Sequence, residues 1–479
     1  MILRVINHPY EFDMKNLCIT FFPHEKIRLE GEEDPVVVTT RRETDGSFFV
    51  SAKVYDVYRE TTAKPEPADE EHLVLSVTLY RLLSGILGFA PPWGVLYGVR
   101  PAKLMHRLCA QMGDDAAVAH FQTAFLTQKS KAELAHEVML HENRSIARSG
   151  PKSFSLYVSI PFCPTRCAYC SFVSHSIEKT HKLMTPYVDL LLRELEETSK
   201  YTKELGLELA TVYFGGGTPT TLSAQDLGRI FSTIEQNFDL SHLMEYTVEA
   251  GRPDTVTRER LEVIRAAGVQ RISINPQSFN DKVLEAIGRR HTAQQTLDAF
   301  ALARDCGFDH INMDFIAGLP EDDLPSFQRS IQTALDLQAE SITVHTLALK
   351  TSAYMVTREQ TFDLKDRLTV SNMVDYAGRT LHGAGYYPYY MYRQSKSLGN
   401  LENVGWCKPG YDCLYNVYMM DETHTVLAVG AGAVTKLRGQ NSGMIERIYN
   451  YKYPYEYIRD FDTLLERKKR IPGFYAEYD

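Results

Sequence analysis

Hydrophobic and polar positions change their spacing twice along the chain and predict three regions. Near the N-terminus, VVVTTRRETDGSFFVSAKVYDVY alternates in the manner of two strands around a DG turn at residues 45–46. From residue 70, apolar residues recur with helical spacing, as they do in PAKLMHRLCAQM and AELAHEVMLHENRS. An SGP linker at 149–151 ends the region. We expect an N-terminal α+β accessory domain over residues 1–150.

The middle of the chain, residues 151–350, alternates short β-branched or aromatic runs with longer amphipathic runs. The expected strands are SLYVSIP, LATVYFG, EYTVEA, RISIN, HINMDFIAG and SITVHTL. Six strand–helix units predict a parallel α/β sheet, open or curled toward a barrel, with its site at the C-terminal ends of the strands. Five of the strands lead into unusual loops: the cysteine run, GGGTPT, EAGRPDT, NPQSFN and AGLPED.

The last region, residues 351–479, is irregular and predicts a mixed C-terminal domain that covers the substrate. A helix is expected from Asp363 to His382, followed by the aromatic stretch GYYPYYMYRQ. Strand alternation explains these tyrosines, and stacking on a flat macrocycle is the alternative.

Composition narrows the class of protein. The chain has 479 residues, is 44% hydrophobic and 24% charged, and carries a net charge of −9, which argues against a large nucleic-acid face. No apolar run is long enough for a membrane span, and the first residues do not resemble a signal peptide. Eight cysteines are too few for a disulfide framework in a chain of this length, so a reducing cytoplasmic setting is expected.

Three of the cysteines, Cys163, Cys167 and Cys170, form a C-x3-C-x2-C run directly after the first strand of the middle region. Thiolates suit iron–sulfur clusters, zinc or copper. Three thiolates on a [4Fe–4S] cluster leave one iron open to bind something else. A zinc site with His175 as its fourth ligand is the alternative on spacing alone.

The amino-acid sequences of the loops resemble those of a known family. C-x3-C-x2-C after one strand and GGGTP after the next resemble the radical S-adenosylmethionine (SAM) enzymes. The series YVSIPFCPTRCAYCSF, YFGGGTPT, VEAGRPD, RISINPQSFN and DFIAGLPED is similar to the oxygen-independent coproporphyrinogen III oxidase family. The two ends look most like its coproporphyrinogen dehydrogenase HemZ branch. The resemblance implies a partial (β/α)6 radical SAM barrel, in which a [4Fe–4S] cluster on the three cysteines binds SAM through its open iron.

The resemblance also implies which residues bind SAM. Gly216, Gly217 and Thr218 match contacts to its methionine end, and glycines there let the backbone approach a ligand and expose its amides. Glu249 matches a further partner for SAM, whereas a lone carboxylate at a strand end is otherwise a rim charge. The remaining matches are Tyr157, Tyr169, Gln277, Arg289, Asp314 and Ala348.

For several of these matched residues, the sequence alone also allows a role other than SAM binding. Arg289 or Arg290 is equally suited to a surface salt bridge, and core packing explains the matched tyrosines as well as cofactor contact does. Asp314 has apolar neighbours and is expected to be buried, where a carboxylate needs partners. Cys407 and Cys413 are too few for a second cluster and are expected to be buried structural thiols.

The activity implied by the resemblance is oxidative decarboxylation of the propionates of coproporphyrinogen III, which gives protoporphyrinogen IX. It needs an electron donor such as flavodoxin or ferredoxin, and no catalytic side chain is assigned. Basic residues must meet the anionic tetrapyrrole, with Arg393 and Lys408 as candidates on charge alone. Phe172 stands where true oxidases of the family carry a fourth cysteine. A heme-binding chaperone and a tetrapyrrole methyltransferase are therefore the alternatives.

Overall fold

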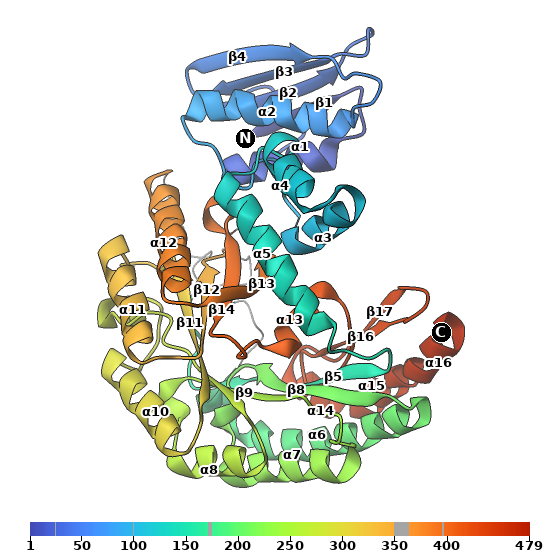
Figure 1. The fold of residues 1–479 in the computed structure, drawn as a ribbon, viewed down its shortest axis with the longest axis vertical. Helices are drawn as coiled ribbons and strands as arrows, with labels where there is room; N and C mark the ends of the chain where they lie inside the picture. Colours follow the sequence, from blue (N-terminus) through green and yellow to red (C-terminus); the bar gives the residue numbers. More distant parts are fainter. Residues whose placement is uncertain (24, 99, 171–174, 349–363, 395–396) are drawn as a thin grey trace.

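The N-terminal part of the molecule is a small α+β unit. The computed structural model describes residues 1–23, 25–98, 100–170, 175–348, 364–394 and 397–479, as Figure 1 shows. A four-stranded sheet of order β1-β2-β3-β4 packs against two helices. The strands are β1 (Ile2–Ile6), β2 (Val36–Arg42), β3 (Phe48–Val54) and β4 (Val57–Ala63), and the helices are α1 (Glu11–Phe21) and α2 (Glu71–Leu87).

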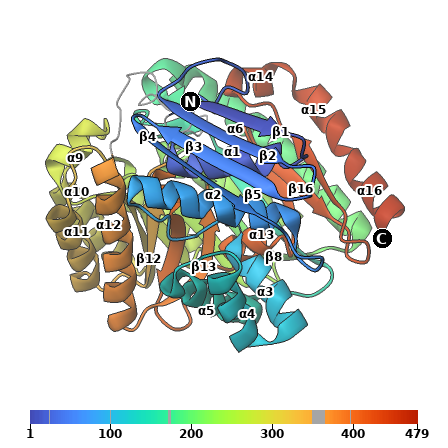
Figure 2. The same cartoon turned by 90° about the horizontal axis from the view of Figure 1, so that it is seen from above.

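The predicted hairpin in this unit is confirmed. β2 and β3 pair antiparallel, and Gly46 in the turn has a φ of +83°, which a residue without Cβ adopts without strain. The side chains of Phe48 and Val50 on β3 and of Leu75 and Leu79 on α2 build a separate hydrophobic core. Seen from above in Figure 2, this sheet lies over the rest of the molecule.

Three helices lead from this unit toward the larger sheet: α3 (Pro101–Met112), α4 (Asp114–Thr123) and α5 (Lys129–Ile146). α3 and α5 confirm two predicted helices. Figure 1 shows α5 running from the N-terminal unit down to the central strands. Met105, Phe121 and Val138 from these helices belong to the large core rather than to the N-terminal one.

The middle region folds as the predicted parallel α/β layer, and all six expected strands are present. They are β5 (Ser153–Ile160), β8 (Glu208–Gly216), β9 (Glu245–Gly251), β10 (Arg271–Ile274), β11 (His310–Ala317) and β12 (Ser341–Thr346), each parallel to its neighbour. Figure 1 shows helices covering the outside of these strands. They are α6 (Ile177–Leu205), α7 (Ala224–Asn237), α8 (Arg258–Ala266), α9 (Asp281–Ala286), α10 (Ala293–Asp305) and α11 (Leu324–Asp336).

Within the described residues, strands from the C-terminal region extend this sheet at both edges to eleven. β13 (Tyr387–Arg393) and β14 (Glu402–Cys407) pair antiparallel and continue from β12, after the predicted helix α12 (Leu364–Gly383). At the other edge, β15 (Thr425–Val429) lies parallel to β5 and is followed by β16 (Val434–Arg438) and β17 (Ile445–Tyr449). The domain boundaries at 150 and 350 stay a proposal, since hydrogen bonds of this one sheet cross the second boundary.

The remaining elements are short or peripheral. α13 (Leu414–Asp421) precedes β15, and α14 (Pro454–Arg459), α15 (Phe461–Lys468) and α16 (Arg470–Tyr478) end the chain. The two-residue strands β6 (Phe162–Cys163) and β7 (His175–Ser176) flank the cysteine loop. Within the described ranges, every helix is too short or too polar to cross a membrane.

Candidate active site

The cysteine loop follows β5 and is tied to the segment after α9. The backbone N–H of Ala168 donates to the carbonyl of Ile287 at 2.9 Å, and Thr165 Oγ1 donates to the carbonyl of Gly288 at 3.2 Å. Arg252 Nη1, from the loop after β9, donates to Thr165 Oγ1 at 2.8 Å. Contacts from two later strand–helix units therefore fix the loop that carries Cys163, Cys167 and Cys170.

The glycine loop after β8 packs directly on the end of β5. The N–H of Gly217 donates to the carbonyl of Ile160, and the N–H of Thr218 donates to that of Phe162, each at 2.8 Å. A Cβ on Gly217 would lie 2.6 Å from the Phe162 oxygen, so only glycine permits this approach. The expectation that this loop exposes its amides is therefore wrong for these two residues, whose N–H groups are already bonded within the protein.

Every residue matched to the family, the three cysteines included, lines one cavity of about 610 Å³. The cysteine and glycine loops meet in it, since Thr218 Oγ1 donates to Cys163 Sγ at 3.4 Å. The cavity also collects side chains from β9 to β13 and from α13. The sheet thus brings together loops that are far apart in sequence, although the role of each residue stays a prediction.

Gln277 has an unusual backbone conformation at this cavity. Its φ is +68°, which side chains other than glycine adopt at a cost. Its N–H donates to the carbonyl of Asp314, and its own carbonyl accepts from Ile316, so β11 holds this conformation. Backbone strain of this kind is common at ligand sites. The Asp314 side chain remains 21% exposed and accepts from Asn312 Nδ2 at 2.7 Å, so the expectation that it is buried is wrong.

The two neighbouring arginines that the sequence left undecided take different positions. Arg289 lines the cavity, where its Nη1 donates to the carbonyl of Asn275 and its Nη2 to the hydroxyl of Tyr169 at 3.2 Å. Arg290 instead forms an exposed ion pair with Glu178 at 2.7 Å. The surface salt bridge therefore belongs to Arg290.

Glu249 is the acidic group whose protonation the cavity affects most. Burial raises the pKa of its carboxyl to about 7, and the negative charge of Asp314 acts in the same direction. The hydroxyl of Tyr213 donates to Glu249 Oε1 at 2.6 Å and partly offsets the rise. The carboxyl therefore changes charge near neutral pH.

Aromatic side chains form a wall of the cavity, and the sequence singled out only some of them. The rings of Tyr157, Tyr213 and Tyr415 are stacked, with 4.4 Å between the centroids of Tyr213 and Tyr415. Tyr390 and Tyr392 on β13 line the same cavity, so strand alternation directs part of GYYPYYMYRQ toward it. Tyr415 lies in the short, largely apolar helix α13, and no sequence signal distinguished it.

Several other candidates lie elsewhere. Arg393 is buried against backbone carbonyls of Leu96 and Asn400, and Lys408 Nζ donates to the carbonyl of Gln338 at 2.7 Å. Neither is among the described residues that line the cavity, so their proposed contact with an anionic substrate there is wrong. Phe172 falls outside the described residues.

The remaining sulfur and imidazole candidates are also not among the described residues that line the cavity. His175 packs edge-on against Tyr453, with 5.7 Å between ring centroids, and is not among the described residues that line the cavity. This argues against the zinc alternative. Cys407 and Cys413 are fully buried, and burial raises the pKa of both thiols. They are neutral thiols in a hydrophobic core, as expected.

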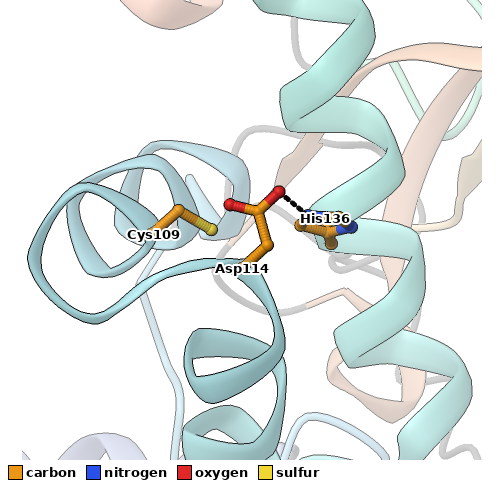
Figure 3. Close-up of side chains that lie close together, drawn as sticks. All are labelled: Cys109, Asp114 and His136. Carbon is orange, nitrogen blue, oxygen red and sulfur yellow. Dashed lines mark hydrogen bonds and ion pairs between the residues drawn. The ribbon is translucent and has the colours of Figure 1, made fainter.

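A second group of metal-ligating side chains lies at the junction of three helices (Figure 3). Cys109, Asp114 and His136 offer ligand atoms within 4.8 Å of one another. His136 Nε2 contacts Asp114 Oδ2 at 3.0 Å. Burial, together with the Asp114 charge, raises the pKa of Cys109 to about 11, so its thiol is protonated at neutral pH. A hydrogen bond between His136 and Asp114, beside a neutral thiol, accounts for this group.

The cavity suits a [4Fe–4S] cluster with SAM. Its cysteines share one loop, and the acceptors Glu249 and Asp314 match the ammonium and hydroxyl groups of SAM. Two buried atoms, Arg289 Nε and Asn275 Oδ1, have no hydrogen-bond partner among the described residues and lie on residues that line the cavity. A donor and an acceptor are thus left for a polar ligand.

Comparison with known proteins gives the class and then the family. The model of the radical SAM superfamily matches residues 157–334. The chain is 34% identical over 470 residues to the oxygen-independent coproporphyrinogen-III oxidase-like protein HemZ of Bacillus subtilis, covering 95% of this chain and 94% of that protein. The chain therefore belongs to the HemZ family of radical SAM proteins. A [4Fe–4S] cluster and SAM are the cofactors of this superfamily.

The chain is also similar to proteins of two related groups. The heme chaperone HemW of Bacillus subtilis is 30% identical over 318 residues, covering 64% of this chain and 79% of HemW. The solved structure of coproporphyrinogen III oxidase (HemN) from Escherichia coli matches with a TM-score of 0.51 and 22% identity, over 68% of this chain and 72% of that one. This similarity supports the fold.

Proposed function

We propose that this protein is a radical SAM oxidoreductase that converts propionate side chains of coproporphyrinogen III into vinyl groups. Its product would be protoporphyrinogen IX, an intermediate of heme biosynthesis. The observation that carries the proposal is the cavity itself, in which the cysteine loop and a wall of tyrosines face one space. The similarity to HemZ along nearly the whole chain supports it.

In the proposed reaction, each propionate side chain loses one hydrogen atom, one CO2 and one electron. When bound, the cluster and SAM would supply the radical chemistry that removes one hydrogen atom from the β-carbon of the side chain. Loss of CO2 from that side chain and transfer of one electron to an acceptor leave the vinyl group. A donor such as flavodoxin or ferredoxin supplies the reducing electron, and the cytosol is the proposed setting.

The chain's own residues hold and orient the reactants in this proposal. Cys163, Cys167 and Cys170 ligate the cluster. Ionised Glu249 would accept a hydrogen bond from SAM, and Arg289 would donate one to SAM. These contacts would hold SAM at a fixed distance from the reacting carbon of the substrate. The tyrosines exclude water and provide flat apolar contact for the macrocycle.

Anaerobic turnover tests the proposal. Reconstituted protein is mixed with a reductant, SAM and coproporphyrinogen III, and the products are quantified together. The expected result is protoporphyrinogen IX with about two molecules of 5′-deoxyadenosine per product, because each vinyl group consumes one radical. The Cys167→Ala variant serves as the cluster-free control. SAM cleavage that does not depend on the porphyrinogen contradicts the proposal.

A heme chaperone is the second candidate function. The similarity to HemW at 30% identity favours it, as does Phe172 in place of a fourth cysteine. A chaperone binds heme and does not couple SAM cleavage to a substrate. Tight heme binding by the reconstituted protein, together with no product in the turnover assay, would select this function.

A further inference from the structure

Arg271 is a buried cation at the cavity with no assigned role. It is the first residue of β10, and its side chain is only 1% exposed. Arg271, Ser273 and Asn275 all line the cavity, whereas Ile272 and Ile274 point to the hydrophobic core on the other face. This alternation is that of a strand, so the guanidinium is directed into the interior of the sheet.

Two nitrogens of the Arg271 guanidinium have no hydrogen-bond acceptor in the described part of the structure. Its Nε and Nη1 are buried and have no partner among the described residues. A buried arginine is stable only when its charge and its donors are both matched, and an unmatched one is costly. The site is therefore incomplete without a further acceptor.

The carboxylates on which the charge of Arg271 acts are already engaged in other hydrogen bonds. Glu245 accepts from the N–H groups of Leu414 at 2.6 Å and Tyr415 at 3.2 Å, at the start of α13. Glu249 accepts from the hydroxyl of Tyr213. Glu245 offsets the charge of Arg271 through space, but no hydrogen bond joins the two in the described structure. Nε and Nη1 of Arg271 are thus left for a ligand.

We propose that Arg271 binds a carboxylate of the substrate at the inner end of the cavity. The guanidinium fork matches a carboxylate in bidentate geometry, and the stacked rings of Tyr213 and Tyr415 line the same space. A flat ring with carboxylate side chains satisfies both features. This inference rests on the proposed function, which supplies a substrate with propionates.

SAM also has a carboxylate, but Arg271 lies at the wrong end of its strand to receive it. The residues matched to SAM follow the ends of their strands or lie near them, as Gln277 does after β10, whereas Arg271 begins β10. Measuring porphyrin binding and SAM binding side by side separates the two sources of carboxylate.

Porphyrin binding tests the inference without turnover. Protein with its cluster reconstituted is titrated with coproporphyrin III and with its tetramethyl ester, at a fixed content of dimethyl sulfoxide, following the porphyrin fluorescence. Wild type is compared with Arg271→Met, with Arg271→Lys, which keeps the charge and loses the fork, and with Lys408→Met, which removes a cation outside the cavity. Iron content and SAM affinity are measured for each variant.

Wild type and Lys408→Met are expected to prefer the free acid over the ester. In Arg271→Met, the preference for the free acid over the ester should fall by about 10- to 100-fold, because a charge-assisted hydrogen bond is lost. The affinity for the free acid should fall, and the affinity for the ester should stay the same. Arg271→Lys should lose part of this preference. If Arg271→Met does not fold, the comparison of Arg271→Lys with wild type tests the inference instead. SAM affinity should stay at the wild-type value.

Two results overturn the assignment of Arg271. One is an acid-over-ester preference equal to wild type in both variants, and the other is weakened SAM binding with unchanged porphyrin binding, which assigns the residue to SAM. A wild-type protein that binds neither porphyrin instead contradicts the proposed function. The failure of each proposal is thus distinguishable.

Discussion

At the scale of single residues, the charge of Glu249 depends on pH near neutrality. Its pKa of about 7 in the folded protein exceeds the usual value of about 4.3 for an unperturbed glutamate. Between these two values the folded protein holds a proton that the unfolded chain has released. The stability that this group contributes is therefore full at low pH and is lost as the pH rises toward 7.

SAM binding should have the opposite dependence on pH. In the proposed role, ionised Glu249 accepts a hydrogen bond from SAM, so the affinity of wild type is expected to rise between about pH 6 and 8, around the pKa of this carboxyl. Glu249→Gln should weaken binding by about 1.5–3 kcal/mol at the upper end of this range and flatten the rise, because it removes a charged acceptor. Anaerobic calorimetry measures both effects.

The matched control for this prediction is Glu178→Gln, which removes an exposed carboxylate paired with Arg290. It should leave SAM affinity unchanged. If Glu249→Gln binds SAM as wild type does, Glu249 is only a charge at the rim of the cavity.

Each cysteine of the triplet should be necessary for the cluster. Replacing Cys163, Cys167 or Cys170 by Ala is expected to remove the broad iron–sulfur absorption near about 400 nm, since each thiolate holds one iron. Iron and sulfide analysis after anaerobic reconstitution checks this result, with Cys306→Ala as the control. Stoichiometric zinc in wild type without iron uptake would favour the zinc site instead.

The sequence could predict the residues of the cavity loops because they break the pattern of their strands. Cysteines, three glycines in a row and polar residues directly after apolar runs stand out against strand alternation. Arg271 does not, since RISIN reads as an ordinary strand that begins with a surface charge. Only the three-dimensional packing of α13 on this end of the sheet buries it.

At the scale of elements, the contact between the glycine loop and β5 positions the cysteine loop. Gly217→Ala should disrupt it, because its Cβ would lie 2.6 Å from a backbone oxygen that cannot move independently. We expect a large loss of reconstituted iron and a lower free energy of unfolding, measured by iron analysis and by chemical denaturation.

Gly85→Ala is the control for this substitution. Gly85 lies in α2, where an added Cβ would meet no heavy atom within 4 Å, so alanine should stabilise the helix by about 0.5–1 kcal/mol. Full iron content in Gly217→Ala would show that the glycine loop does not support the cluster.

The elements that the sequence predicted are those with a buried face. Apolar residues on the face that packs against the helices mark the six central strands, and on β10 they alternate with the polar residues that line the cavity. β4 was missed because its side chains are exposed and leave no hydrophobic pattern. The pairing of β15 with β5 was also missed, since strand propensity does not say which distant segment becomes a neighbour.

At the scale of the whole molecule, a buried ion cluster joins the N-terminal helices to the sheet. Lys131 on α5 forms ion pairs with Glu402 on β14 at 2.7 Å and with Asp375 on α12 at 2.8 Å. Trp93 Nε1 donates to the second oxygen of Glu402 at 2.7 Å. Four segments distant in sequence therefore meet at one lysine and its two carboxylate partners.

Removing the cation should destabilise the molecule strongly. Lys131→Met is expected to lower the free energy of unfolding by about 3–5 kcal/mol, because it leaves Glu402 buried and charged without its partner. Lys129→Met, at an exposed position in the same helix, should change it by less than about 0.5 kcal/mol. Chemical denaturation followed by circular dichroism compares them, and equal stabilities would refute the role of the cluster.

Because β15 pairs with β5, the order in which the chain is synthesised also matters for the nascent protein. β5 leaves the ribosome long before β15, so in the nascent chain one edge of the strand that leads to the cysteine loop stays open. An open apolar edge recruits other strands and promotes aggregation. Premature termination upstream of β15 would therefore expose this edge permanently, and quality control should remove such fragments even though they contain every cysteine of the triplet.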